Sequence, residues 1–171
     1  KEEMIRKLKT YGKFDQEQVT NAELIIHQCI NYTTDRRHLA YILSTAIGEC
    51  DLKLIKEMKA KEGTKLWELQ KRYWYTGYYG RGFMQITWEE VYARFGRILG
   101  VDLVGNPDLA LDPIIASKII CMGMKKGLFT GVSLDKYFND TTSDWFNARR
   151  IINILDKAQI FADRAVAIHN A

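Results

Sequence analysis

The sequence predicts a single, mostly α-helical domain with one irregular loop near its middle. Apolar residues recur at intervals of three and four along most of the chain, which is the spacing of one helix face. Only two of the 171 residues are proline, and no repeat, linker or low-complexity tract divides the chain. With 47% apolar and 27% charged residues the composition is that of a globular protein, so residues 1–171 are expected to form one domain.

The first predicted helices follow from apolar spacing. Residues 15–32 and 35–49 each repeat apolar residues at helical intervals, and Asp35 gives the second helix an acidic N-cap. A third amphipathic stretch covers residues 65–73. These segments predict that most of the first half of the chain is helical.

Three further segments predict helices in the second half. Residues 87–90, Thr-Trp-Glu-Glu, have the pattern of a capping box that opens a helix ending at Gly100. Residues 112–127 begin with Asp-Pro and end with glycine, which favours a helix between them. Apolar spacing over residues 143–168 predicts one long helix or two.

Residues 73–83 have the most unusual composition in the chain, with three glycines and six aromatic residues. Such a segment is not a regular helix, because glycine lowers helix propensity and permits positive φ. Aromatic rings offer flat faces for contact. We therefore expect an irregular loop or short hairpin around residues 74–87 that holds a ligand.

The net charge is +4, from 25 basic and 21 acidic residues, and residues 51–72 hold seven basic against four acidic side chains. This excess suits an anionic polymer, but the chain has a single Arg-Gly unit and no basic stripe, so no nucleic-acid partner is expected. No apolar run approaches the ~18 residues of a membrane span, so no membrane insertion is expected. No secretory signal is visible at the start, although a first residue other than Met leaves a removed signal open.

The three cysteines, Cys29, Cys50 and Cys121, are isolated in sequence and lack the spacing of a zinc site. We expect no disulfide framework, and Cys29 and Cys121 are interpreted as buried thiols. The histidines likewise lack ligand spacing. Neither a metal nor another cofactor is expected.

Two carboxyl groups are candidates for acid–base chemistry. Glu49 follows the apolar helix of residues 39–47, so its side chain emerges where a core helix reaches the surface, although a solvated helix-end role is the alternative. Inverting glycosidases separate their two carboxyl groups by ~6.5–9.5 Å. Glu57 lies eight residues further on, and a continued helix would bring the two side chains near that range. Glu62 and Glu68 are weaker alternatives.

Residues 78–87, Tyr-Tyr-Gly-Arg-Gly-Phe-Met-Gln-Ile-Thr, resemble the signature loop of glycoside hydrolase family 19. This family comprises chitinase-like enzymes of lysozyme fold and includes many phage endolysins. The similarity continues through residues 100–103, 106–110, 129–131 and 148–153. It implies a bilobal, lysozyme-like helical domain that cleaves β-1,4 bonds next to N-acetylated sugars by inversion and without a metal.

The resemblance also implies roles for single residues. Glu49 occupies the position of the general acid, and Glu57 best matches the general base. The remaining implied site residues are Gln85 and Thr87, which hold substrate and the attacking water, and the cleft positions Tyr79, Arg81 and Asn153. Two alternatives stay open: Thr87 caps a helix only, and Arg81 braces the loop through an acidic partner.

Three departures from the family pattern lie near these residues. Gly48 replaces a histidine before the acid, Cys50-Asp51 replaces Thr-Gly-Gly, and Val91 stands where many members have asparagine. The expected function is cleavage of peptidoglycan by a monomeric, endolysin- or muramidase-like hydrolase. A chitinase and a catalytically silent wall-glycan-binding module are the alternatives. An endolysin would stay in the host cytoplasm until its release to the cell wall, whereas a trimmed N-terminus would fit secretion.

Overall fold

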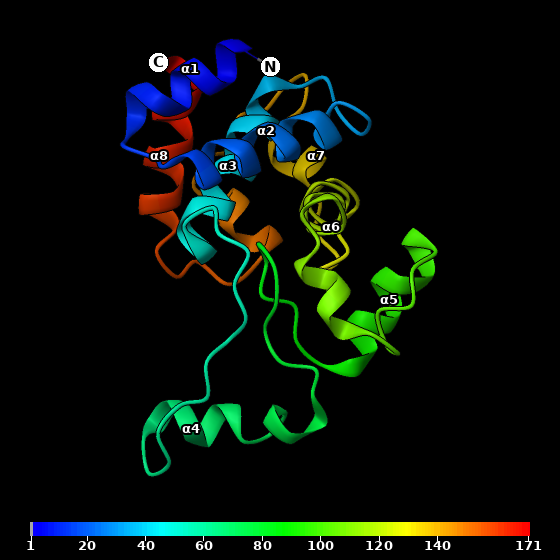
Figure 1. The fold of residues 1–171 in the computed structure, drawn as a ribbon. Helices are drawn as coiled ribbons and strands as arrows, with labels where there is room; N and C mark the ends of the chain where they lie inside the picture. The colour runs from blue at the N-terminus through cyan, green and yellow to red at the C-terminus, as the bar shows by residue number, and fades with distance from the viewer. Residues whose placement is uncertain (1) are drawn as a thin grey trace.

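The computed structural model describes residues 2–171, and the chain is almost entirely helical (Figure 1). The α-helices are α1 (Glu2–Tyr11), α2 (Gln16–Cys29), α3 (Arg36–Cys50), α4 (Lys65–Gln70), α5 (Glu89–Leu99), α6 (Pro113–Lys126), α7 (Leu134–Tyr137) and α8 (Ala158–Asn170). The short 3-10 helices are η1 (Trp74–Thr76), η2 (Pro107–Leu111) and η3 (Asn147–Ile151). Among the described residues, extended pairing is limited to isolated β-bridges. The predicted mostly α-helical class is confirmed.

Helix α3 lies at the centre of the larger hydrophobic core. Its residues 39–46 are each at most 7% exposed, because α2, α6 and α8 pack around it and α1 covers α2 and α8. Two hydroxyl groups within this stretch are satisfied internally: Ser44 Oγ donates to Phe161 O at 2.8 Å, and Thr45 Oγ1 donates to Tyr41 O at 2.8 Å. The buried Tyr41 hydroxyl has no partner among the described residues. Helix α3 is therefore held on all sides up to its last turn.

A second, smaller core joins α5, η2 and part of α6. Helix α6 belongs to both cores: Ile120 and Met124 face the larger one, whereas Ile119 and Met122 face the smaller one. The two cores give the chain two lobes with α6 between them, which matches the bilobal form that the family resemblance implies.

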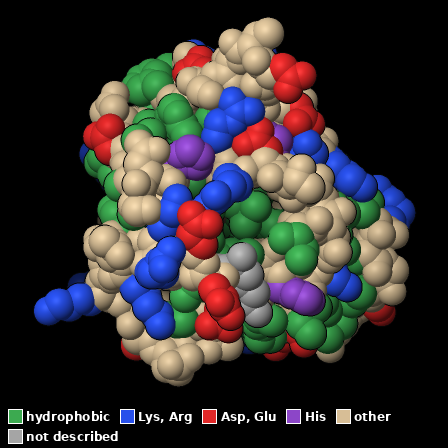
Figure 2. All heavy atoms as spheres, turned by 90° about the horizontal axis from the view of Figure 1, so that it is seen from above, with side chains coloured by type: hydrophobic (Ala, Val, Ile, Leu, Met, Phe, Trp, Pro, Cys, Tyr) green, Lys and Arg blue, Asp and Glu red, His purple; other side chains and the backbone are tan. Residues whose placement is uncertain are grey.

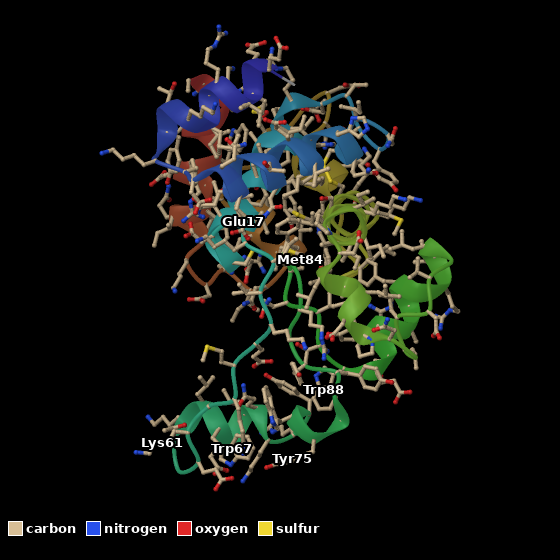
Figure 3. The ribbon with its side chains drawn as sticks, in the orientation of Figure 1. Glu17, Lys61, Trp67, Tyr75, Met84 and Trp88 are labelled. Atoms are coloured by element: carbon tan, nitrogen blue, oxygen red, sulfur yellow. A yellow bond between two sulfur atoms is a disulfide. The ribbon has the colours of Figure 1, made fainter. Side chains whose placement is uncertain are left out.

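Residues 55–77, here called the arm, extend away from the helical body and contain α4 and η1 (Figures 1 and 3). The base of the arm is tied to the following loop by a bridge between Lys56 and Arg81 and by the Glu57 amide, which donates to Gly80 O at 2.8 Å. Among the described residues, no apolar residue of the arm belongs to either core cluster. The arm is therefore joined to the rest of the protein by polar contacts at its base and by aromatic contacts with the following loop.

Several helix boundaries follow local sequence signals. Asp15 forms a capping box with Gln18 at the start of α2, and Asp112 accepts hydrogen bonds from two backbone amides at the start of α6. Gly100 and Gly127 end α5 and α6 in the left-handed conformation, as their positions in the sequence predict.

Other boundaries differ from the predictions. No helix was predicted for residues 2–11, which form α1, and α4 ends at Gln70 rather than at residue 73. Residues 143–168 do not form one long helix: η3 and α8 are separated by irregular chain, and Lys157 has a positive φ of 55°. This break allows the Asp156 carbonyl to accept a hydrogen bond from Arg149 Nε at 3.0 Å.

The cysteine prediction is wrong for two of the three residues. Cys29 of α2 and Cys121 of α6 form a disulfide across 92 residues of sequence, with their Cα atoms 5.3 Å apart. The spacing in sequence gave no signal because α2 and α6 meet only in the folded core. Cys50 is free, and its burial raises the pKa of the thiol to about 12, so this group stays protonated.

The surface of the helical body carries charges of both signs. On the face seen in Figure 2, basic and acidic side chains are interspersed. Within residues 2–171, no helix is long and apolar enough to cross a bilayer. In the same range, no three His, Cys, Asp or Glu side chains come together as metal ligands would.

The disulfide is expected to stabilise the fold, because it restricts a long loop in the unfolded chain. Replacing both Cys29 and Cys121 with alanine should lower the free energy of unfolding by about 2–4 kcal/mol, measured by urea denaturation. Cys50→Ala is the control, because it leaves the disulfide intact. Reductant should lower the urea midpoint of this variant as it lowers that of the wild type. A wild-type midpoint that does not change on reduction would contradict the prediction.

Candidate active site

Glu49 lies in the last turn of α3, where it contacts Arg149. Arg149 Nη1 donates to Glu49 Oε1 at 2.9 Å, and no described residue bonds Oε2. Arg149 is 4% exposed, and its guanidinium lies 3.8 Å from the centre of the Phe161 ring. One carboxyl oxygen is therefore fixed by a buried cation, and the other is available to a ligand.

The chain reverses directly after Glu49, so the continued helix considered from the sequence does not form. Asp51 and Leu52 both have a φ of 56°, which turns the backbone out of α3. Their carbonyls accept hydrogen bonds from α2: Gln18 Nε2 donates to Asp51 O at 2.9 Å, and Asn21 Nδ2 donates to Leu52 O at 2.8 Å. Two amide side chains thus fix the turn between the candidate acid and the candidate base.

Glu57 lies at the base of the arm and accepts three hydrogen bonds. Tyr73 Oη and Gln70 Nε2 donate to Oε1 at 2.5 and 3.1 Å, and the Gly80 amide donates to Oε2 at 2.9 Å. Gln70 is fully buried, and it also donates to Met58 O at 2.8 Å. The carboxylate is therefore held in one orientation by donors from α4, from the segment before η1 and from residues 78–87, here called the glycine loop.

Tyr73 is suited to this role because its hydroxyl stays protonated. Burial raises the pKa of Tyr73, and the hydrogen bond to Glu57 raises it further. Its ring packs edge-on against Trp88, with the ring centres 5.5 Å apart. Trp88 lies between Met84 and the arm in Figure 3.

The alternative acids Glu62 and Glu68 lie elsewhere on the arm. Both are exposed and pair with lysines of the arm, Glu62 with Lys59 at 3.6 Å and Glu68 with Lys71. Each glutamate is three residues from its lysine in sequence. Their surroundings are those of solvated surface ion pairs, which contribute little.

The glycine loop is tied to the base of the arm by Gln85. This residue has a positive φ of 51°, and its Nε2 donates to Ile55 O and Gly82 O, each at 2.9 Å. A Cβ at Gly80 would come within 3.2 Å of Glu57 Cβ. The same Cβ would lie 2.7 Å from Gln85 Oε1, so a side chain at position 80 would displace Gln85 from its place in the loop.

Arg81 is buried, and its Nε and Nη1 donate to groups within the protein, whereas no described residue accepts a hydrogen bond from Nη2. Its Nε donates to Asp108 Oδ1 at 2.9 Å, and its Nη1 donates to Gly77 O at 2.8 Å and to Tyr92 Oη at 3.0 Å. Tyr79 stacks on Trp74, with the ring centres 4.3 Å apart. The geometry of Arg81 favours the bracing alternative.

Thr87 does not begin the helix that follows it, so the predicted capping box is wrong. The N-cap of α5 is Trp88, with φ 77°, whereas Thr87 Oγ1 donates to Gln85 O at 3.1 Å. Thr87 lines a pocket of about 190 Å³ with Gln85, Val91, Arg94 and four other residues. The pocket also includes Ile152, the neighbour of Asn153. Asn153 is exposed, and its side chain accepts a hydrogen bond from the next backbone amide.

Packing against α8 explains the glycine before the candidate acid. A Cβ at Gly48 would overlap the Phe161 ring and the Arg164 guanidinium, so no side chain fits there. Arg164 Nη1 donates to Ser44 O at 2.9 Å, which fixes it against α3. A histidine at position 48 is therefore incompatible with the packing of α8 in this chain.

Sequence reasoning missed the partners of both carboxyl groups. Tyr73 was noted only as part of the aromatic segment, and Arg149 only as part of a matching motif. Nothing in the sequence singles out Gln70, because a glutamine in an amphipathic helix is usually a surface residue. A buried amide beside a carboxylate becomes visible only in the folded arm.

Two carboxyl groups on a helical scaffold, next to a loop rich in glycine and aromatic residues, are the groups that an acid–base glycoside hydrolase needs. Residues 46–125 match the family model described as chitinase class I, which supports the resemblance of this part of the chain to glycoside hydrolase family 19. The predicted family is confirmed. The matched residues include Glu49, Glu57, Tyr73 and Gln85, but not Arg149.

Curated relatives match over a shorter stretch. Endochitinase A2 of Pisum sativum, endochitinase 1 of Theobroma cacao and basic endochitinase B of Arabidopsis thaliana are each 57% identical to this chain over 42 residues. That stretch is 24% of this chain and 12–13% of those proteins. The similarity is therefore high but local.

Tyr73→Phe removes one donor to Glu57 and keeps the ring against Trp88. We expect kcat for a soluble N-acetylglucosamine oligomer to fall about tenfold or more, because a hydrogen bond to a charged group contributes about 1.5–3 kcal/mol. KM should change little. Tyr75→Phe, which alters an exposed tyrosine of the same arm, is the control and should keep wild-type kcat. Equal losses in the two variants would remove Tyr73 from the site.

Proposed function

We propose that this chain is a glycoside hydrolase that cleaves β-1,4 bonds next to N-acetylated sugars by an inverting acid–base mechanism. Glu49 is the general acid and Glu57 the general base. The fixed orientation of Glu57, held by Tyr73, Gln70 and Gly80 within the segment that matches the chitinase family, carries this proposal.

The proposed roles follow from how each carboxyl group is held. Arg149 binds one oxygen of Glu49, so the other oxygen delivers the proton to the leaving sugar oxygen. Both oxygens of Glu57 accept hydrogen bonds, and their remaining lone pairs orient and deprotonate a water. In this mechanism Gln85 and Thr87 line the pocket beside the loop and hold substrate and water.

Chitin-like polymers of N-acetylglucosamine are the first candidate substrate, because the relatives with 57% identity are named endochitinases. Peptidoglycan presents the same kind of bond, and the net charge of +4 suits an anionic wall polymer. It is therefore the second candidate. A wall-binding module without activity is the alternative that a hydrolysis assay excludes.

The two carboxyl groups are tested by Glu49→Gln and Glu57→Gln. Both should lower kcat by about 10²–10⁴-fold, because an amide neither donates the proton nor accepts one. Azide should partly restore only Glu57→Gln, since this anion attacks without a base. Product analysis by NMR should show inverted anomers in the wild type.

Glu62→Gln and Glu68→Gln are matched controls on the same arm, and both should keep wild-type kcat. Full activity of Glu49→Gln would refute the mechanism. If Glu57→Gln keeps full activity and one of the two control variants loses it, the glutamate changed in that control variant is the general base.

The substrate is tested by incubating equal amounts of enzyme with an N-acetylglucosamine hexamer and with purified peptidoglycan. We expect the hexamer to be cleaved and the new reducing end to be N-acetylglucosamine, identified by mass after reduction. Cleavage of peptidoglycan alone would replace chitin with the second candidate. Binding of both glycans without cleavage of either would make the chain a binding module.

A further inference from the structure

The arm exposes large apolar side chains that the proposed catalytic site does not use. Met58 is 84% exposed, Tyr75 74%, Leu66 59% and Leu69 58%. Single exposed apolar residues are common on proteins, but these four belong to one 18-residue part of a protruding element. Among residues 2–171, neither core cluster includes any of them. Tyr75 contacts the Trp67 ring edge-on, with the ring centres 6.0 Å apart, but all four side chains remain largely open to solvent.

Helix α4 orients part of this surface. Its buried residues are Trp67 and Gln70, which face the rest of the arm. Leu66 and Leu69 are three residues apart, so they share a side of the helix turned away from that contact, and Lys65 lies next to them. Figure 3 shows Lys61, Trp67 and Tyr75 along the arm, away from the helical body.

The arm is also the basic part of the chain. It contains six Lys and Arg against three Glu, a net charge of +3, whereas the whole chain carries +4. Lys59 Nζ lies 5.0 Å from the centre of the Trp67 ring and 5.7 Å from that of Tyr75. Within residues 2–171, no carboxylate forms an ion pair with Lys61, Lys65 or Arg72. Three cations of the arm are therefore free to meet an external anion.

We propose that the arm binds an anionic lipid surface, with Leu66, Leu69, Met58 and Tyr75 entering the headgroup region and Lys61, Lys65 and Arg72 meeting lipid phosphates. Exposed aliphatic side chains next to lysines gain free energy at such an interface. Tyrosine and tryptophan rings are enriched there. A soluble glycan or a nucleic acid offers no apolar layer in which leucine and methionine can be buried.

This binding departs from the sequence-based expectation of no membrane insertion. That expectation rested on the lack of a long apolar run, which a spanning helix needs. Peripheral binding needs only a short exposed apolar cluster and neighbouring cations. The arm has both, and it needs no membrane-spanning segment.

The test is co-sedimentation of the full chain with vesicles, either of phosphatidylcholine alone or of phosphatidylcholine and phosphatidylglycerol in equal parts. The wild type should bind the mixed vesicles and release them as salt increases. Lys61→Gln/Lys65→Gln/Arg72→Gln should lower the partition coefficient by on the order of 100-fold. Leu66→Gln/Leu69→Gln, which leaves the charge unchanged, should lower it about tenfold.

Ile98→Gln/Ile160→Gln is the matched control, because these isoleucines are 45% and 55% exposed on α5 and α8. It should bind vesicles as the wild type does. Hydrolysis of a soluble N-acetylglucosamine oligomer should be unchanged in the leucine variant, which separates this proposal from the catalytic one. No wild-type binding to either vesicle would overturn the proposal. So would a leucine variant that loses glycan binding and keeps vesicle binding, since the surface would then belong to the glycan cleft.

Discussion

The burial of α3 on all sides is the constraint on which the rest of the structure depends. A helix that is buried on every face from residue 38 to residue 46 cannot shift without opening the larger core. Its final turn therefore places Glu49 at a fixed point of the surface. Gln18 and Asn21 then hold the reversal that follows, so the extended chain leaves the core in one direction. The arm and the glycine loop are positioned relative to that exit.

The two carboxyl groups are held by different parts of the molecule. Glu49 belongs to the core, and its partner Arg149 is fixed by the Asp156 carbonyl and the Phe161 ring. Glu57 belongs to the arm, which has no hydrophobic core of its own. Gln70 joins Glu57, Met58 and Ala60 through hydrogen bonds, so the same contacts order the arm and orient the carboxylate. The order of this element and the geometry of the candidate site are therefore linked.

Local features of the sequence predicted local structure. Asp15 and Asp35 begin α2 and α3 as expected, because a cap needs only its own helix. The Thr87 pattern failed because Trp88 adopts a positive φ, and the Thr87 hydroxyl turns back to Gln85. Cys29 and Cys121 gave no signal, since their contact depends on the packing of α2 against α6.

Only part of the candidate site was predicted, because some of its contacts are local in sequence and others depend on the fold. Both carboxyl groups were proposed from local features: Glu49 follows an apolar helix, Glu57 lies eight residues further on, and the family resemblance agreed with both. Their partners come from elsewhere in the chain: Arg149 lies 100 residues after Glu49, and Gln70 and Tyr73 reach Glu57 only once the arm folds back. Hydrogen-bond donors that lie so far away in sequence cannot be recognised from the periodicity or the composition of the chain.

The disulfide also changes what a break in the backbone would do. The exposed tip of the arm, near Gly63, lies between Cys29 and Cys121 in sequence. A protease that cuts there leaves two polypeptides that remain one covalent molecule, joined through α2 and α6. Glu57 would then belong to the first fragment, and its donors Gln70 and Tyr73 to the second. Glu49 and α3 would stay in the core that the disulfide joins. Proteolysis at this tip would separate the two halves of the Glu57 environment without releasing either piece.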